Sequence, residues 1–135
     1  MDFSKYISTD HSTYTEAAPL ITDLLITKGR LKGGWLYFPS GPAGLLHVKV
    51  LRGGHQVLPA TPEEDIALDD CMVPLFLDLD VAYPPLLLQI YTWNLSTSAA
   101  HALTICFFLD PYKPPRDPWY RRFFQQPEEI DTDEL

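Results

Sequence analysis

The chain lacks the residues on which several classes of function depend. Ten lysines and arginines stand against 18 aspartates and glutamates, which gives the 135-residue protein a net charge of −8. Binding to a nucleic acid requires clustered cationic side chains that neutralise phosphates. The densest cluster here consists only of Lys28, Arg30 and Lys32. We therefore expect no nucleic acid among the partners of this protein.

Long apolar runs and export signals are also missing. The most apolar stretch, residues 72–90, is interrupted by Asp78, Asp80 and the pair Pro84-Pro85. No segment therefore reaches the roughly 18 apolar residues of a membrane-spanning helix. The first residues do not combine a basic region with an apolar one, so we predict no signal peptide, no membrane association and a cytoplasmic location before any assembly.

Cysteine and histidine are scarce, and neither is spaced as metal ligands are. The two cysteines, Cys71 and Cys106, are far apart in the sequence, and we expect both to be reduced thiols. No two of the four histidines are two or four residues apart, as two ligands from one strand or helix would be. The sequence therefore predicts no metal centre and no cofactor.

A catalytic constellation is absent as well. Ser40 and Cys71 are the only arguable nucleophiles, and neither lies in a nucleophile elbow or beside a recognisable partner motif. Asp78 and Asp80 share one face of a candidate strand and could act as paired carboxylates, but a solvent-exposed sheet face explains their spacing more simply. The acidic residues of segment 63–70 lack the alternating ligands and the turn glycine of a calcium loop. We predict that the protein is not an enzyme.

What the chain does contain is a series of short segments with two-residue periodicity, separated by many of its 13 prolines and seven glycines. Gly53-Gly54 between two apolar runs predicts a hairpin, and residues 100–109 are apolar on both faces, which predicts a strand covered on both sides. Such strands without crossover helices predict an all-β fold, an antiparallel β-sandwich arranged as a jelly roll. The candidate strands are Tyr14–Ala18, Ile21–Thr27, Arg30–Phe38, Leu45–Arg52, His55–Leu58, Met72–Val81, Leu86–Asn94 and Ala100–Leu109.

The two ends of the chain differ from this pattern. We predict an N-terminal arm at residues 1–12, the jelly-roll sandwich at 13–110 and an extended C-terminal arm at 111–135. Four prolines between residues 111 and 118 make the start of the C-terminal arm stiff. Asp117 as N-cap and Pro118 as first helical residue then predict a short helix that ends before Pro127.

This helix would place aromatic rings on one side and arginines on the other. A helix of about two turns is not stable alone in water, so we predict that the arm binds a neighbouring molecule. The predicted partner-binding residues are Trp119, Tyr120, Arg121, Arg122, Phe123 and Phe124.

A second group of aromatic residues supports an alternative function. Trp35 and Tyr37 share one face of a candidate strand, and Tyr91 and Trp93 share one face of another. Rings in a row on a sheet face are typical of carbohydrate-binding sandwiches, whereas large rings more often fill a core. The alternative is a carbohydrate-binding or adhesin-type module in which these four residues hold a glycan.

Several short motifs occur together between Trp35 and Asp110: Phe38-Pro39-x-Gly41-x-Ala43-Gly44-Leu45, then His55-Gln56-x-x-Pro59, Pro84-Pro85-Leu86 ahead of Trp93-Asn94, and His101 before the final strand. In these motifs the segment resembles small phage- and prophage-encoded β-sandwich proteins associated with virions. The resemblance implies a structural virion protein, such as a capsid-decoration, minor capsid or tail-associated protein. It implies as partners copies of the chain itself, in a homo-oligomer, or a larger capsid or tail protein. It assigns no catalytic residue and does not include the C-terminal arm.

Overall fold

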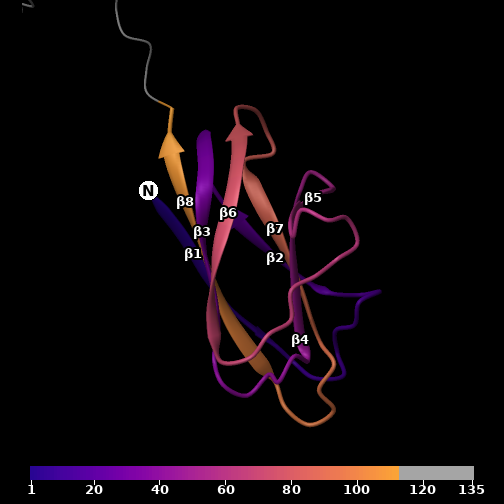
Figure 1. Cartoon of the computed structure of the whole chain (residues 1–135). Coiled ribbons are helices and arrows are strands. Elements are labelled where there is room, and N and C mark those ends of the chain that lie inside the picture. Colours follow the sequence, from indigo (N-terminus) through magenta and orange to yellow (C-terminus); the bar gives the residue numbers. More distant parts are fainter. Residues whose placement is uncertain (113–135) are drawn as a thin grey trace, which may run out of the picture.

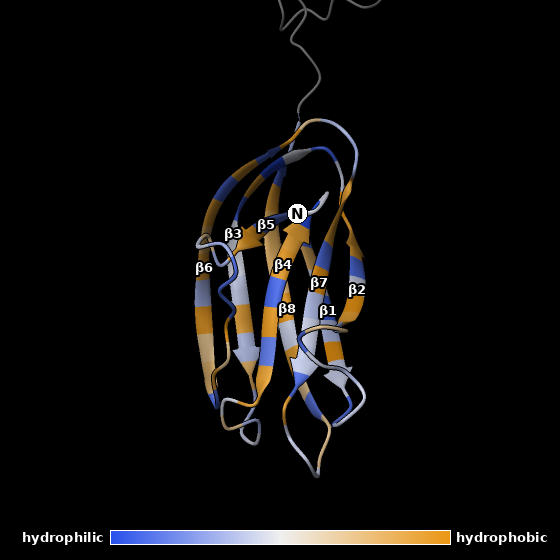
Figure 2. Ribbon diagram, turned by 90° about the vertical axis from the view of Figure 1, so that its right-hand side faces the viewer, coloured by the Kyte–Doolittle hydropathy of each residue, from blue (hydrophilic) through white to orange (hydrophobic). Residues whose placement is uncertain are grey.

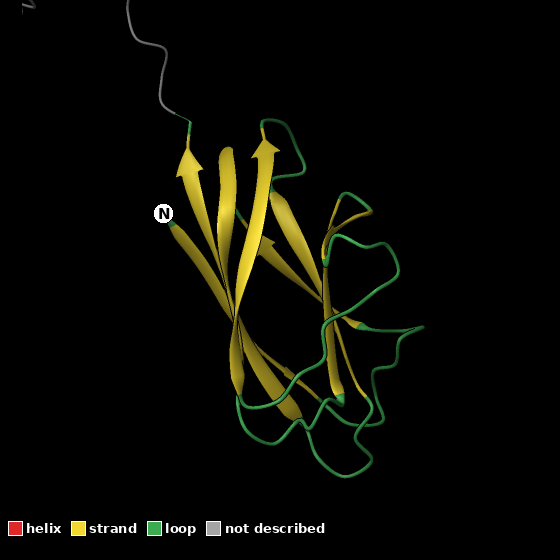
Figure 3. Cartoon of the chain, viewed as in Figure 1, coloured by secondary structure: helices red, strands yellow, loops and turns green. Residues whose placement is uncertain are grey.

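The computed structural model describes residues 1–112. These residues form eight strands and contain no helix (Figure 3), so the all-β fold class is confirmed. The described range accordingly offers no helix long and apolar enough to cross a membrane. The helix predicted in the C-terminal arm lies outside the described residues. The strands are β1 Asp2–Thr9, β2 Leu20–Leu25, β3 Gly29–Phe38, β4 Leu46–Arg52, β5 His55–Leu58, β6 Cys71–Val81, β7 Leu87–Asn94 and β8 His101–Pro111.

The strands form two four-stranded antiparallel sheets (Figure 1). The order in the first sheet is β1-β8-β3-β6, and the order in the second sheet is β2-β7-β4-β5. The pairing is nested, because β1 pairs with β8, β2 with β7, β3 with β6 and β4 with β5.

In the turn that joins β4 to β5, Gly53 and Gly54 have φ angles of 58° and 83°. These are values that a tight two-residue hairpin turn requires of both residues, and the predicted hairpin is confirmed.

One hydrophobic core lies between the two sheets, and alternate residues of the strands supply it. Leu103, Ile105, Phe107 and Leu109 are the inward residues of β8, and all four are buried. The same alternation of apolar and polar positions is visible along β4 (Figure 2). Each such side chain contributes roughly 1.5–3 kcal/mol when it is fully buried, so this core is the main source of stability.

Residues 2–9, which the sequence assigned to an N-terminal arm, form strand β1 instead. This strand pairs along its whole length with β8, and the amino group of Met1 donates a hydrogen bond to the Leu109 carbonyl at 3.1 Å. In β1 only Ile7 and Thr9 are buried, so the apolar alternation is too weak to identify a strand from the sequence. The sheets therefore begin at residue 2 and not at residue 13.

The candidate strand Tyr14–Ala18 is also corrected, because these residues form a turn before β2. The backbone groups of Thr15 and Ala18 bond to each other in both directions, at 3.1 and 3.2 Å, and the Thr15 hydroxyl accepts a further bond from the Ala18 N–H. Pro19 follows and has no N–H to offer a neighbouring strand. Local hydrogen bonding of this kind competes with strand pairing.

Candidate functional site

The outward side of the first sheet carries a continuous group of large apolar side chains, which we call the aromatic face. Its members come from all four strands, and the strand registers place them in adjacent rows. In the first row Thr104 connects Tyr6 to Tyr37, and Met72 follows on the other side of Tyr37. In the second row Trp35 lies between Cys106 and Pro74. In the third row Gly33 lies between Phe76 and Phe108. The aromatic face consists of Tyr6, Trp35, Tyr37, Met72, Phe76 and Phe108.

Most of this face is open to solvent in residues 1–112. Phe76 is 85% exposed, Tyr6 69% and Met72 60%, while Tyr37 and Phe108 are each about two-fifths exposed. Contiguous apolar patches of this kind are uncommon on soluble monomers and usually mark an interaction site. The sequence predicted that β8 is covered on both sides. Within the described residues its inward side is covered, whereas Phe108 on its outward side remains exposed.

A β-bulge shapes one end of the aromatic face. The registers of β3 with both β6 and β8 shift between Leu31 and Gly33, and Gly33 has a φ of 146°. A Cβ at Gly33 would lie 2.5 Å from the Leu75 carbonyl oxygen, so only glycine fits there. Phe76 and Phe108 stand on either side of Gly33, about 10 Å apart if each strand is about 4.8 Å from the next. Gly33 itself contributes no side chain to the row of Phe76 and Phe108.

Acidic side chains border the same end of the face. Arg30 lies in register between Asp80 and Asp110, and its guanidinium donates to the Asp78 carboxylate at 2.8 Å. This hydrogen bond, reinforced by charge attraction, lowers the pKa of Asp78 and raises the pKa of Arg30. Lys32 lies 3.8 Å from the same carboxylate. With Asp2 in register with Phe108, four carboxylates stand near three cations, the side chains of Arg30 and Lys32 and the Met1 ammonium, so this border keeps a small excess of negative charge.

The second sheet holds a different aromatic cluster, which is structural. The imidazole of His47 stacks on the Trp93 indole, with ring centroids 5.3 Å apart and planes 9° apart. Nδ1 of His47 also lies 2.7 Å from the Asp65 carboxylate. The Lys49 ammonium lies 5.8 Å from the ring centroids of both Tyr91 and Trp93. The cluster fastens the loop after β5 to strand β4.

The four residues of the alternative glycan site are therefore divided between two surfaces. Trp35 and Tyr37 lie on the outward side of the first sheet, and Tyr91 and Trp93 lie on the outward side of the second. Only Tyr37 is well exposed, and Trp93 is 2% exposed beneath His47. The structure does not bring the four rings into one row.

The six predicted partner-binding residues of the C-terminal arm lie outside the described residues. The acidic loop of residues 63–70 is described, and two of its carboxylates have structural partners. Asp65 binds His47, and Asp69 accepts hydrogen bonds from the N–H groups of Gly41 and Ala43 at 3.0 and 2.9 Å. Within residues 1–112 no group of three acidic, histidine or cysteine side chains is placed to hold a metal ion.

The two cysteines stand on opposite sides of the first sheet. Cys71 on β6 faces the core side and Cys106 on β8 faces outward, and both are free thiols. Because their side chains point away from each other, they do not meet the geometry of a disulfide. Burial raises the pKa of the Cys106 thiol, and the nearby charge of Asp2 adds to the increase.

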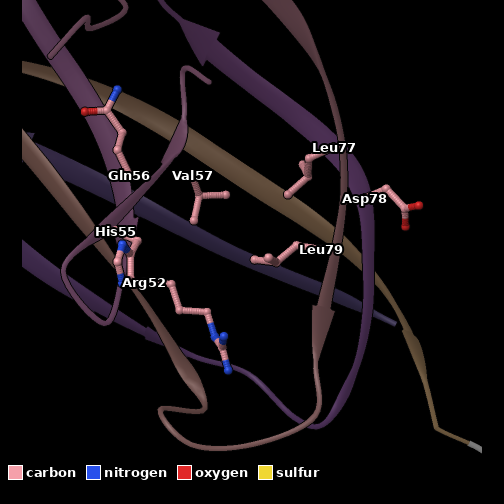
Figure 4. A pocket seen from close by; sticks show the side chains of 7 residues that line it. All are labelled: Arg52, His55, Gln56, Val57, Leu77, Asp78 and Leu79. Atoms are coloured by element: carbon pink, nitrogen blue, oxygen red, sulfur yellow. The ribbon is translucent and has the colours of Figure 1, made fainter. Parts of the chain in front are cut away.

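A cleft of about 390 Å³ opens between the β4–β5 hairpin and β6 (Figure 4). Leu77 and Leu79 point toward Val57 across it, whereas Asp78 points to the other side of its strand. The guanidinium of Arg52 is engaged by the carbonyls of Tyr83 and Pro85. The amide of Gln56 donates to three backbone carbonyls of the following loop. Polar groups thus serve the fold here and do not converge on a ligand position.

The sequence reasoning identified Trp35 and Tyr37 but missed the rest of the aromatic face. Two signals were available: Phe76 lies between Leu75, which is buried, and Leu77, which is partly buried against the core, and the outward positions of β8 include Phe108. Comparison with known proteins found no matching family model, and no significant match among curated proteins or solved structures.

Proposed function

We propose that this protein is a structural assembly subunit that binds copies of itself through the aromatic face. The observation that carries this proposal is the exposure of five large apolar side chains on one continuous sheet face. Aromatic residues and methionine are enriched at protein–protein interfaces, and burial of such rings usually provides most of the binding energy.

We further propose that the two sheets form a jelly roll. The support is the nested pairing of β1 with β8, β2 with β7, β3 with β6 and β4 with β5. This is the pairing expected if one long hairpin is rolled into two sheets. Jelly rolls occur in viral capsid and lectin domains. Together with the resemblance to phage proteins, this favours a capsid-decoration, minor capsid or tail-associated protein located in the virion.

The aromatic face suits a protein surface better than a sugar. A sugar ring needs hydrogen-bond partners for its hydroxyl groups around the ring on which it stacks. Phe76 and Phe108 provide none and the Met72 thioether is only a weak acceptor, while the indole of Trp35 is half-buried. Carbohydrate binding therefore stays the second candidate, carried by the exposed rings of Tyr6 and Tyr37.

The proposal is tested by replacing one exposed ring. Phe76→Ser should leave the fold intact, because this side chain makes little contact with the core. It should weaken self-association of the full chain by about 30-fold or more, the effect of losing a hot-spot residue of roughly 2 kcal/mol. The matched control is Leu25→Ser on the second sheet, where Leu25 is 70% exposed.

Self-association is measured by sedimentation velocity over a range of concentrations. The control should sediment as the unmodified chain does. A full chain that stays monomeric at every concentration would contradict the proposal. So would a Phe76→Ser variant that associates as strongly as the control.

A further inference from the structure

We infer that the aromatic face receives residues 113–126 from a second copy of this chain. The inference rests on the proposed function and names the occupant of the surface. The end of β8 lies inside the first sheet, where Pro111 pairs with Gly29 and the Tyr112 N–H donates to the Lys28 carbonyl at 3.4 Å. Residue 113 therefore follows directly from the sheet that carries the face.

The segment also has the length to reach across the face. The aromatic face extends from the row of Tyr6 to the row of Phe76, which is four residues along a strand. At about 3.3 Å per residue this distance is roughly 13 Å. Fourteen residues span up to roughly 43 Å in an extended polyproline conformation and roughly 21 Å as a helix. Residues 113–126 are long enough to cross the face in either form.

The segment and the rest of the chain are chemically complementary. Residues 1–112 contain six lysines and arginines and twelve aspartates and glutamates, which gives a net charge of −6. Residues 113–126 contain four cations and one aspartate, a net charge of +3, together with four aromatic rings. In an extended segment, Arg122 and Phe124 share one side, and Arg121 and Phe123 share the other. On the face, exposed Phe76 and Phe108 lie directly beside the negative border.

The direction of β8 indicates which copy supplies the segment. The pairing of Pro111 with Gly29 directs β8 past the end of its own sheet. To return to its own face, the chain would have to reverse direction. Pro114 and Pro115 favour extended backbone at the start of the segment, and an extended start favours a neighbouring copy over such a reversal.

The test uses two full-length variants, each defective in one side of the contact. Phe76→Ser damages the receiving face, and the double substitution Trp119→Ala with Phe123→Ala damages the inserted segment. Each variant alone should associate at least 30-fold more weakly than the unmodified chain. An equimolar mixture should form heterodimers, because the intact face of one variant accepts the intact segment of the other.

A photo-crosslinking amino acid at position 37 then identifies the occupant and its origin. The substituted chain is mixed with an equal amount of ¹⁵N-labelled unmodified chain, irradiated, digested and analysed by mass spectrometry. The predicted product joins position 37 to a peptide from residues 113–126, with the two peptides carrying different isotopes. Products in which both peptides always carry the same isotope would show that the segment covers its own face, and would overturn the inference.

The remaining outcomes separate this inference from the proposed function. If Phe76→Ser weakens association but the segment variant associates normally, the face is an interface with another occupant, and only the inference fails. If Phe76→Ser has no effect, both fail. If the mixture of the two weakened variants associates no more strongly than either variant alone, the exchange between copies is also overturned.

Discussion

Replacement of Trp93 by alanine separates a structural role of this residue from a glycan-binding one. The indole is almost completely buried, stacks on His47 and lies beneath the Lys49 ammonium. Removal of a buried Trp side chain costs about 3–5 kcal/mol. Most of the roughly 0.5–1.5 kcal/mol lost with the stacked partner ring is already included in that cost. We therefore expect Trp93→Ala to lower the free energy of unfolding by about 4 kcal/mol.

The loss is measured by urea denaturation followed by far-UV circular dichroism, which does not depend on the tryptophan that has been removed. In a domain of this size, about 4 kcal/mol should lower the melting temperature by roughly 15 °C. Trp35→Ala is the matched control, and its half-buried indole should cost less, about 1–2 kcal/mol. A Trp93→Ala variant as stable as the unmodified chain would refute the structural assignment, and loss of glycan binding in that variant would favour the carbohydrate alternative.

Three further predictions concern polar and titratable groups. Asn94→Ala should cost about 3 kcal/mol in urea denaturation, because the buried Asn94 amide donates to the carbonyls of Thr9 and Ala99 and accepts from the Ser96 N–H. Asp78→Asn should flatten the fall of the melting temperature below about pH 4. The pKa of Asp78 is lowered in the folded state, so its ionised form stabilises the fold above the ordinary carboxyl pKa, and this contribution is lost as the pH falls through the lowered value. At pH 8 the Cys106 thiol, whose pKa burial raises, should react more slowly with Ellman's reagent than Cys71 does, and the two rates should become equal in denaturant.

The periodicity of the sequence was sufficient to predict most of the fold. Segments such as Leu75–Val81 alternate clearly, because one side of each strand must face the core, and the structure confirms that Leu75 and Val81 are buried while Asp78 and Asp80 are exposed. The β1 strand was missed because an edge strand buries few residues and owes its conformation to pairing with β8. That pairing joins residues about 100 positions apart, and no local pattern encodes it.

The candidate site was harder to predict, because it depends on which strands become neighbours. Tyr6, Tyr37 and Met72 each look like isolated exposed residues in the sequence. They form one row only because β1, β8, β3 and β6 lie side by side in that order. Trp93 was misleading for the opposite reason: a residue on the outward side of a strand is buried, because His47 from the adjacent strand covers it.

The central claim, that the aromatic face is buried when the protein assembles, is tested most directly by hydroxyl-radical footprinting of the full chain at low and high concentration. Oxidation of Tyr6, Met72 and Phe76 should decrease as the concentration rises. Oxidation of Tyr83, which is 77% exposed and follows β6 outside the aromatic face, should not change. Equal oxidation of Tyr6, Met72 and Phe76 at both concentrations, in samples shown by sedimentation to be assembled at the higher one, would contradict the claim.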